Sequence, residues 1–220
     1  MNKYIIIPAY NPSKILYELL KDIKSESNIF ILIIDDGSLN PINFDMNDIK
    51  IIRNKKNQGK GAALKRGFKW GLENDYKYAI TIDSDGQHPV SKLNEFIKVD
   101  DSYDFVFGKR TFSNDMPLHR RLSNYLTSLL VSYRINNKIY DSQCGYRRYN
   151  ISKIKPKNYL ENRFMFETEI LLKLINKKTK IKHISIPTIY NNEPSNINNI
   201  LTTYNFIKLY FRSIFYDKSF

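Results

Sequence analysis

In the first 110 residues, short runs of apolar and β-branched residues alternate with stretches in which apolar residues recur every three or four positions. The runs predict buried strands, which we place at residues 3–8, 28–34, 49–53, 79–82 and 104–108. The intervening stretches predict helices at about residues 13–26, from residue 59 onward, and at about 91–99. Because strands that alternate with helices form βαβ units, we expect an α/β fold with a mainly parallel sheet flanked by helices.

The second half of the chain is richer in apolar residues at helical spacing. Leucines recur between residues 118 and 130, a helix is expected at about 165–175, and a strand at 181–186. Apolar and aromatic residues at three- and four-residue steps, interspersed with Lys208 and Arg212, predict an amphipathic helix within residues 195–220. Such a helix fits either a membrane interface or the protein core, and its aromatic content favours the interface.

Polar side chains follow three of the predicted strands: Tyr10 and Asn11, then Asp35 and Asp36, then Asp83 and Asp85. Right-handed crossovers place the carboxyl ends of parallel strands at one edge of the sheet, where ligands bind. The side-chain oxygens of Asp85 and Gln87 are ligands that Mg²⁺ or Mn²⁺ prefers when it also holds a diphosphate. Alone, this acidic turn is more typical of a cap on the next helix, but the clustering of polar strand ends favours a binding site.

Two groups of residues are suited to binding an anion. Gly59, Lys60 and Gly61 predict a helix start with free backbone N–H groups. Their spacing is neither that of a P-loop nor that of a dinucleotide fingerprint, so an ordinary helix entry explains them equally well. Guanidinium groups bind phosphates bidentately, which suits three arginines that follow the acidic turn: Arg110, Arg120 and Arg121.

Some of these side chains have a structural interpretation beside the functional one. Asp36 would accept a hydrogen bond from a nucleobase with Tyr10 beside the ring, or it would start an Asx-turn while Tyr10 packs on the core. Asp35 is the second choice for the base contact. His88 has no second His at ligand spacing, so a turn histidine is favoured over a metal ligand.

The net charge of +13 is unevenly distributed. Residues 1–110 hold 17 Lys and Arg against 15 Asp and Glu, whereas residues 111–220 hold 18 against 7. A basic half indicates an anionic partner such as a nucleic acid, a phosphorylated substrate or an anionic lipid surface. The chain has no apolar run of 18 residues, no signal-peptide pattern and one cysteine, so we expect a protein of the reducing cytosol.

Seven segments, taken in order, carry a resemblance to a known family. They are PAYN at residues 8–11, DDGS at 35–38, NQGKGA at 57–62, DSDGQHP at 83–89, GKR at 108–110, RRLSN at 120–124 and QCGYR at 143–147. Together they resemble the family 2 glycosyltransferases of GT-A fold, above all the branch with dolichol-phosphate mannose synthase and bacterial polyprenyl-phosphate glycosyltransferases. One departure is Pro12, where the family usually has Glu, and this bears on one nucleotide contact.

The resemblance implies a nucleotide-sugar donor and a role for each matching segment. The residues that would hold the nucleotide are Pro8, Ala9, Tyr10, Asn11, Asp36, Lys60, Asp83 and Ser84. Asp85 and Gln87 would bind Mg²⁺ or Mn²⁺, while Arg110 and Arg121 would meet donor or acceptor phosphates. We expect one GT-A domain at residues 1–194, with a nucleotide-sugar-binding half at 1–110 and an acceptor half at 111–194, followed by the C-terminal helix.

The expected reaction is an inverting, metal-dependent sugar transfer in which the acceptor displaces the nucleoside diphosphate. The basic half favours a polyprenyl phosphate as acceptor, and the alternative is a hydroxyl of a saccharide or glycolipid, which requires a carboxylate base. We assign catalysis to Asp85, Asp141, Arg110 and Arg121. Asp141 is the first candidate for the base, with Glu167 and Glu169 behind it.

Two rival functions explain less of the sequence. A sugar-nucleotide pyrophosphorylase would need a glycine- and arginine-rich signature after the first strand, and this signature is absent. A basic nucleic-acid-binding module would explain the basic half but not the acids at the strand ends. We therefore expect no nucleic acid partner. We expect instead a peripheral protein at the inner face of a membrane, held there by its C-terminal helix or by a membrane partner protein.

Overall fold

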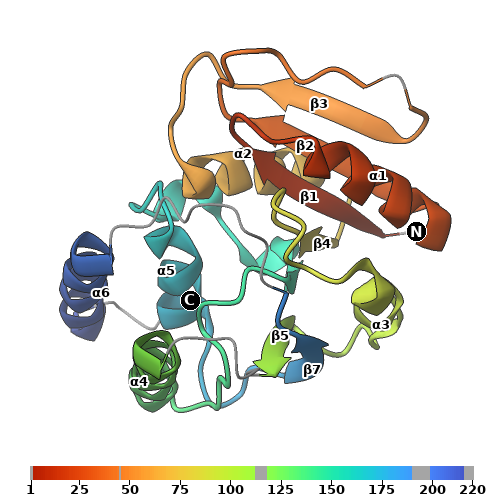
Figure 1. Cartoon of the computed structure of the whole chain (residues 1–220). Coiled ribbons are helices and arrows are strands. Elements are labelled where there is room, and N and C mark those ends of the chain that lie inside the picture. Colours follow the sequence, from red (N-terminus) through yellow and green to blue (C-terminus); the bar gives the residue numbers. More distant parts are fainter. Residues whose placement is uncertain (1, 45, 112–117, 190–198, 216–220) are drawn as a thin grey trace.

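A seven-stranded sheet runs through the computed structural model, which describes residues 2–44, 46–111, 118–189 and 199–215 (Figure 1). The strands are β1 (Lys3–Ala9), β2 (Phe30–Asp35), β3 (Ile49–Arg53), β4 (Tyr78–Thr81), β5 (Phe105–Thr111), β6 (Arg147–Asn150) and β7 (Ile181–Pro187). The α-helices are α1 (Ile15–Glu26), α2 (Lys60–Glu73), α3 (Leu93–Lys98), α4 (Leu118–Ile135), α5 (Met165–Leu174) and α6 (Asn199–Ile214). Short 3₁₀ turns are η1 (Val90–Lys92), η2 (Ile151–Lys153) and η3 (Pro156–Asn158).

The strand order is β3-β2-β1-β4-β6-β5-β7, and strands from both halves of the chain share the sheet. β1, β2, β3 and β4 pair in parallel, as do β5 and β7, whereas β6 is antiparallel to both of its neighbours. These pairings confirm the mainly parallel α/β fold that the sequence predicts.

Strand β6 lies in a segment for which the sequence predicted no strand. Its first two residues, Arg147 and Arg148, are almost completely buried. The Arg147 guanidinium donates to the carbonyl oxygens of Cys144 and Ser142, each at 2.6 Å, and Arg148 donates to that of Val99 at 2.6 Å. Backbone carbonyls thus satisfy two charges that would otherwise exclude this segment from a central strand.

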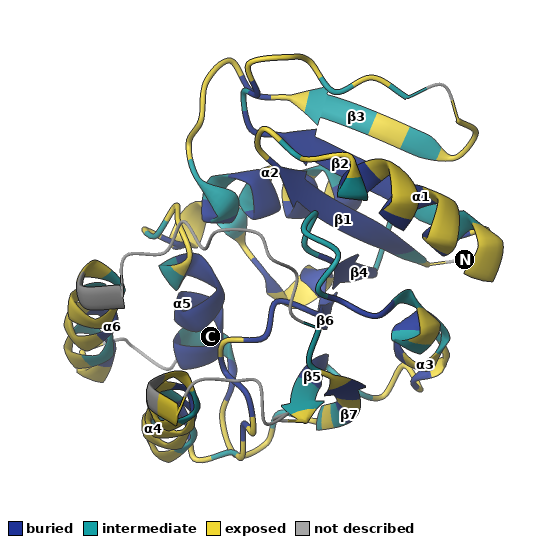
Figure 2. Ribbon diagram, in the orientation of Figure 1, coloured by how far each residue is buried: buried dark blue, intermediate teal, exposed yellow. Residues whose placement is uncertain are grey.

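The two faces of the sheet are covered by separate hydrophobic cores, because alternate residues of a strand point to opposite faces. Ile6 belongs to the core that includes residues of α2, α5 and α6, whereas Ile5 and Ile7 belong to the core with residues of α1 and α3. Figure 2 shows the central strands as buried and the outward sides of the surrounding helices as exposed.

Helix α4 is amphipathic, but most of its large apolar residues lie on its exposed side. It buries Asn124 and Ser128, which are 1% and 4% exposed, together with Val131 and Ile135. Its large apolar residues are exposed instead: Leu118, Leu122, Tyr125, Leu126, Leu129, Leu130 and Tyr133. We call these seven residues the α4 apolar face.

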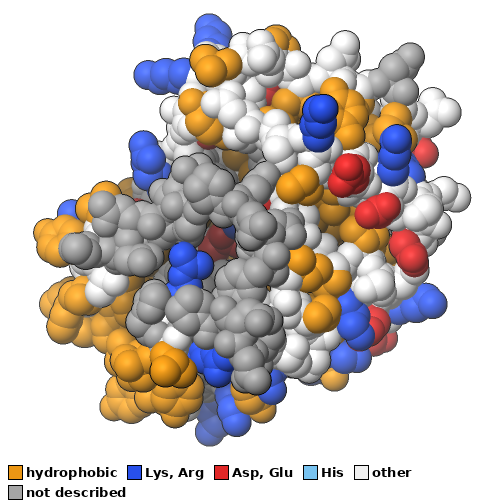
Figure 3. All heavy atoms as spheres, in the orientation of Figure 1, with side chains coloured by type: hydrophobic (Ala, Val, Ile, Leu, Met, Phe, Trp, Pro, Cys, Tyr) orange, Lys and Arg blue, Asp and Glu red, His pale blue; other side chains and the backbone are white. Residues whose placement is uncertain are grey.

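Helix α6 combines both environments that the sequence left open for it. Phe206 and Leu209 pack in the core, at 7% and 1% exposed. Its outward side carries Leu201, Tyr204, Ile207, Phe211 and Ile214, each about half exposed or more, which we call the α6 apolar face. α4 and α6 both pack on α5, and Arg134 of α4 donates a hydrogen bond to the Ser213 carbonyl of α6. In Figure 3, hydrophobic side chains gather over the region that these two helices occupy in Figure 1.

Within the described residues, no helix combines the length and the apolar character needed to cross a bilayer.

Candidate active site

The carboxyl ends of β1, β2 and β4 meet at one edge of the sheet, as the sequence predicts. β1 pairs with β2 in a register that sets Ala9 opposite Asp35, and with β4 so that Ile6 is opposite Thr81. The segments that leave these three strands therefore begin side by side.

Two hydrogen bonds connect the loop after β1 to the loop after β2. The Asn11 backbone N–H donates to the Ser38 hydroxyl at 2.9 Å, and the Asn11 side chain accepts from the Leu39 N–H at 2.7 Å. Asn11 has a φ of 46°, in the left-handed region that asparagine tolerates. Tyr10 is 48% exposed in this loop, so it does not pack on the core and remains available to a ligand.

Asp36 is buried and shapes the loop that leads into α2. Its carboxylate accepts hydrogen bonds from the Gly59 N–H at 2.7 Å, the Gln58 N–H at 3.0 Å and the Asn54 amide at 2.7 Å. A carboxylate at the start of a helix is also favoured by the helix dipole. The Gly59 N–H, which the sequence suggested as part of an anion site, thus binds Asp36. The contact of Asp36 with a nucleobase stays a prediction.

Asp35, the second choice for the base contact, forms the turn that the sequence assigned to Asp36. It accepts from the Ser38 N–H at 2.8 Å and forms an ion pair with Arg53 at 2.7 Å. Burial disfavours its ionised form, but hydrogen bonds from Ser38 and Ile42 and the charge of Arg53 lower the pKa of Asp35 below its ordinary value.

Lys60, the first residue of α2, joins two acids from separate elements. Its ammonium lies 2.7 Å from Asp83 Oδ1, after β4, and 2.9 Å from Glu167 Oε2, on α5. Burial disfavours the charged forms, but the opposite charges prevail: the pKa of Lys60 is raised and that of Asp83, which His88 also approaches, is lowered. Gly145 makes room for this pair, because a Cβ there would lie 2.7 Å from Asp83 Oδ2.

Asp85 is the acid whose ionised form is disfavoured. Burial, followed by the negative charge of Asp83, raises its pKa above the ordinary value. One of its oxygens, Oδ1, accepts the Gln87 N–H at 3.0 Å. His88 completes the turn as the sequence predicted, because its Nδ1 accepts the Asp83 N–H at 3.0 Å.

These donors fit a divalent cation. Asp85 supplies a carboxylate whose pKa is raised by burial and by a neighbouring acid, so a bound cation would relieve that repulsion. Among the described residues, no group of three or more His, Cys, Asp and Glu side chains is placed to hold a metal ion. A site with Asp85, the Gln87 amide and diphosphate oxygens agrees with both observations, because Mg²⁺ commonly takes one or two carboxylates and otherwise substrate phosphates and water.

Arg110 and Asp141 form an ion pair with two hydrogen bonds. Arg110 Nε lies 2.7 Å from Asp141 Oδ2, and Arg110 Nη2 lies 2.9 Å from Oδ1. Backbone N–H groups of Gln143 and Cys144 also donate to Oδ1. Burial opposes ionisation, but the hydrogen bonds and charge of Arg110 outweigh it and hold the pKa of Asp141 below its ordinary value. A carboxylate held in this way is a weak proton acceptor, so the geometry favours Asp141 as a support for Arg110 over its predicted role as base.

The other residues of the predicted acceptor half are less closely grouped. Arg121, in the second turn of α4, is half-buried, whereas Arg120 is exposed. Glu169 is fully buried but belongs to a different cluster, where it pairs with Lys173 at 2.9 Å and accepts the N–H groups of residues 160 and 161. Glu169 therefore serves the fold.

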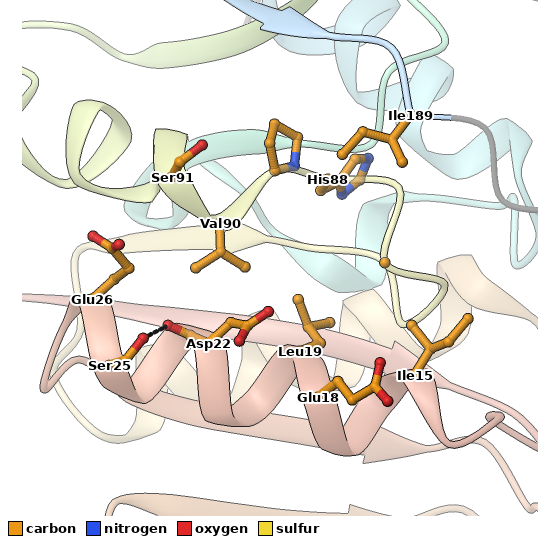
Figure 4. A pocket seen from close by; sticks show the side chains of 12 residues that line it. Ile15, Glu18, Leu19, Asp22, Ser25, Glu26, His88, Val90, Ser91 and Ile189 are labelled. Carbon is orange, nitrogen blue, oxygen red and sulfur yellow. Dashed lines mark hydrogen bonds between the residues drawn. The ribbon is translucent and has the colours of Figure 1, made fainter.

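A groove of about 570 Å³ lies behind the acidic turn, between α1 and residues 86–91 (Figure 4). Glu18, Asp22 and Glu26 line its α1 side, and Gly86 and His88 come from the turn. Asp83 and Asp85 are not among its lining residues, so this groove is distinct from the cluster around Lys60.

The sequence profile of glycosyl transferase family 2 matches residues 4–215. The chain belongs to this family. It is 30% identical to a UDP-N-acetylglucosamine–dolichyl-phosphate N-acetylglucosaminyltransferase of Methanococcus voltae, over 85% of this chain and 85% of that protein. It is 26% identical to an undecaprenyl-phosphate mannosyltransferase of Micrococcus luteus, over 70% of this chain and 69% of that one. The predicted kinship with polyprenyl-phosphate glycosyltransferases is thus confirmed.

Solved structures of similar fold support the GT-A architecture. A glucosyl-3-phosphoglycerate synthase of Mycobacterium tuberculosis superposes with a TM-score of 0.69 at 13% identity, covering 99% of this chain and 81% of that one. At this identity the likeness establishes the fold and nothing finer. The family 2 glycosyltransferase described here is therefore an enzyme of GT-A fold.

The sequence did not predict the contacts that two residues, Glu167 and Arg147, make near Lys60 and Asp83. Glu167 was considered only as a base, because nothing in its helical context indicated a contact with Lys60, 107 positions earlier. Arg147 is one of the charges that lower the pKa of Asp83, yet two consecutive arginines gave no sign of a buried strand.

Proposed function

We propose that this glycosyltransferase moves a sugar from a nucleotide-sugar donor to a polyprenyl phosphate at a membrane surface. The single observation that carries the choice of acceptor is the α4 apolar face together with the α6 apolar face. Soluble proteins rarely expose contiguous apolar surface of this kind unless it binds a partner or a membrane. The names of the relatives, which act on dolichyl phosphate and undecaprenyl phosphate, point to the same acceptor class.

On the donor side, the loop with Tyr10 and Asn11 would bind the base, and Asp83 with Lys60 would lie by the ribose or phosphates. Asp85 and Gln87 would hold Mg²⁺ or Mn²⁺, which when bound stabilises the charge of the leaving diphosphate. Arg110, which is held by Asp141, would orient the acceptor phosphate through its guanidinium group. The side chain of Arg110 is 24% exposed.

The state of Asp141 also favours a phosphate acceptor. A phosphate monoester has a second pKa of about 6, so it is already anionic at neutral pH and attacks without first losing a proton. A sugar hydroxyl would require a carboxylate free to accept its proton. Because Asp141 is engaged by Arg110 and two backbone N–H groups, it suits the first reaction better than the second.

A panel of acceptors tests this proposal. The protein is incubated with UDP- and GDP-sugars, Mg²⁺ or Mn²⁺, and either undecaprenyl phosphate, undecaprenol or a soluble oligosaccharide. We expect a glycolipid with undecaprenyl phosphate and none with undecaprenol, which matches it in the lipid but lacks the phosphate. Equal transfer to undecaprenol, or transfer to the oligosaccharide alone, would show that a hydroxyl is the acceptor.

Membrane attachment is the second part of the proposal. The α4 and α6 apolar faces would lie in the interface of an anionic bilayer, so that neither a spanning helix nor a membrane partner protein is needed for the enzyme to reach a lipid phosphate. The enzyme would then act as a peripheral protein at the inner face of the membrane.

A further inference from the structure

Glu167 occupies a place in the donor site that the proposed transfer leaves unexplained. It lies in the first turn of α5, is 7% exposed, and contacts Lys60 through Oε2. Its other oxygen, Oε1, is buried and accepts no hydrogen bond within the part of the chain that the structure describes. Burying an unsatisfied carboxylate oxygen lowers the free energy of unfolding, which indicates a use other than stability.

The contact between Lys60 and Glu167 is set by the backbone. The Ala62 N–H of α2 donates to the Asn162 carbonyl at 2.9 Å, which ties the start of α2 to the segment before α5. Gly61 allows this approach, since a Cβ there would lie 2.5 Å from the Cβ of Phe166. The two elements are therefore held so close that the side chains of Lys60 and Glu167 must meet.

The charges in this cluster do not balance. Two cationic groups, the ammonium of Lys60 and the guanidinium of Arg147, lie near the carboxylates of Asp83 and Glu167, and Asp85 adds a third negative charge nearby. Without Glu167, the two cationic groups would balance Asp83 and Asp85. The presence of Glu167 therefore leaves the cluster with surplus negative charge, which repels a diphosphate and attracts a divalent cation.

We infer that Glu167 sets the charge of the donor site: by neutralising Lys60, it makes nucleotide diphosphate binding depend on a divalent cation. Glu167 acts through Lys60, so it is a positioning residue and not a catalytic one. The inference rests on the proposed nucleotide-sugar donor. It concerns the order of binding, because the cation must reduce the negative charge before the diphosphate can enter.

The test is Glu167→Gln, which removes the charge with little change of shape. Titration calorimetry measures UDP and GDP binding in EDTA and in Mn²⁺, and electron paramagnetic resonance measures Mn²⁺ binding to the free protein. We expect Mn²⁺ to bind about tenfold more weakly and the nucleotide to bind about tenfold more tightly in EDTA, because the variant removes a unit negative charge from the cluster that would meet both ligands. Activity is not needed for either readout.

Two further variants make the result specific. Glu161→Gln removes a nearby carboxylate that pairs with Arg212 at 2.8 Å instead of Lys60, and it should leave both affinities unchanged. Lys60→Met should shift both affinities opposite to Glu167→Gln, which keeps the test valid if that variant does not fold. Unchanged affinities in Glu167→Gln, or equal losses with and without metal, would overturn the inference. Failure of the wild-type protein to bind any nucleotide would instead refute the proposed donor.

Discussion

At the scale of single residues, the pKa shifts separate Asp85 from Asp35, Asp83 and Asp141, whose pKa values are lowered. Asp36 and Asp141 are almost fully buried, and each is surrounded by hydrogen-bond donors. Asp85 differs, because burial and the negative charge of Asp83 raise its pKa above the ordinary value. A bound cation would relieve the repulsion between Asp83 and Asp85, so the raised pKa of Asp85 favours a cation site here.

The substitution Asp85→Asn should separate activity from stability. We expect metal-dependent transfer to fall by about 10²-fold or more, because the carboxylate that would hold the cation is lost. The unfolding temperature without metal should stay the same or rise: the raised pKa means that ionised Asp85 destabilises the folded state as the pH rises above the ordinary value of 3.8. Thermal unfolding in EDTA, followed by an activity assay in Mn²⁺, measures both. A lower unfolding temperature with full activity would assign Asp85 to the fold.

Asp141→Asn should act through Arg110. Because the pKa of Asp141 is lowered, its ion pair stabilises the protein above the ordinary pKa of 3.8 and is lost as the pH falls through the lower value of the folded state. The variant should therefore lose about 2–3 kcal/mol of stability at pH 7, and the difference from wild type should shrink in acid. Denaturant unfolding at pH 7 and pH 3 measures this.

The pH dependence of transfer distinguishes a supporting Asp141 from a base. If Asp141 positions Arg110, Asp141→Asn should raise the KM for the lipid phosphate and keep the shape of the pH–rate profile. Loss of the acidic limb of that profile, with an unchanged KM, would identify Asp141 as the proton acceptor.

At the scale of elements, α4 shows that spacing alone does not reveal which side of a helix is buried. Its leucines recur as in a core helix, yet the side chains that the protein buries include Asn124 and Ser128. Ser128 hydrogen-bonds the Ser142 hydroxyl at 3.1 Å, so a polar partner on the next segment, and not apolar periodicity, decides the orientation. That partner lies 14 residues away and has no signature in the local sequence.

Removing apolar side chains from α4 should weaken membrane binding without unfolding the protein. The variant Leu126→Ser/Leu129→Ser changes two residues of the α4 apolar face that are 46% and 51% exposed. Each buried leucine contributes roughly 1–2 kcal/mol to partitioning, so liposome binding should fall by about tenfold or more. Sedimentation with anionic vesicles measures binding, and thermal unfolding shows whether the fold is kept.

Val131→Ser is the matched control, because Val131 is on the same helix but fully buried. It should lower the unfolding temperature and leave the vesicle affinity of the folded protein intact. If the leucine pair instead lowered stability and left vesicle binding unchanged, the α4 apolar face would be a site for protein packing.

The sheet and the meeting of its polar strand ends were largely predictable from the sequence, since both follow from local patterns. Apolar runs such as residues 28–34 define the parallel strands, and topology then brings Asp36, Lys60 and Asp83 to one edge. The rest depends on contacts between distant segments. Arg147 lies in a central strand only because backbone carbonyls receive its guanidinium.

At the scale of the whole molecule, charge and apolar surface concentrate in the same half of the chain. Residues 111–220 carry 18 Lys and Arg against 7 acids, and they include both α4 and α6. The acids of α1, by contrast, belong to the half with nearly balanced charge, and Figure 4 shows Glu18, Asp22 and Glu26 along the groove between α1 and residues 86–91. We propose that the half at residues 111–220 faces the anionic membrane and that the acids of α1 face water.

The two contributions to membrane binding should respond differently to salt. Electrostatic attraction to anionic lipid is screened within a Debye length of about 8 Å at 0.15 M salt, whereas apolar insertion is not. Binding to vesicles with anionic lipid should therefore fall several-fold between 0.05 and 0.5 M NaCl and then level off above zero, as roughly estimated from that screening length. In the Leu126→Ser/Leu129→Ser variant the residual binding at high salt should fall by about tenfold or more, because two of the side chains that would insert into the bilayer are lost. Complete loss of wild-type binding at high salt would mean that the two helices only touch the surface, and the lipid phosphate would then have to leave the bilayer to reach Arg110.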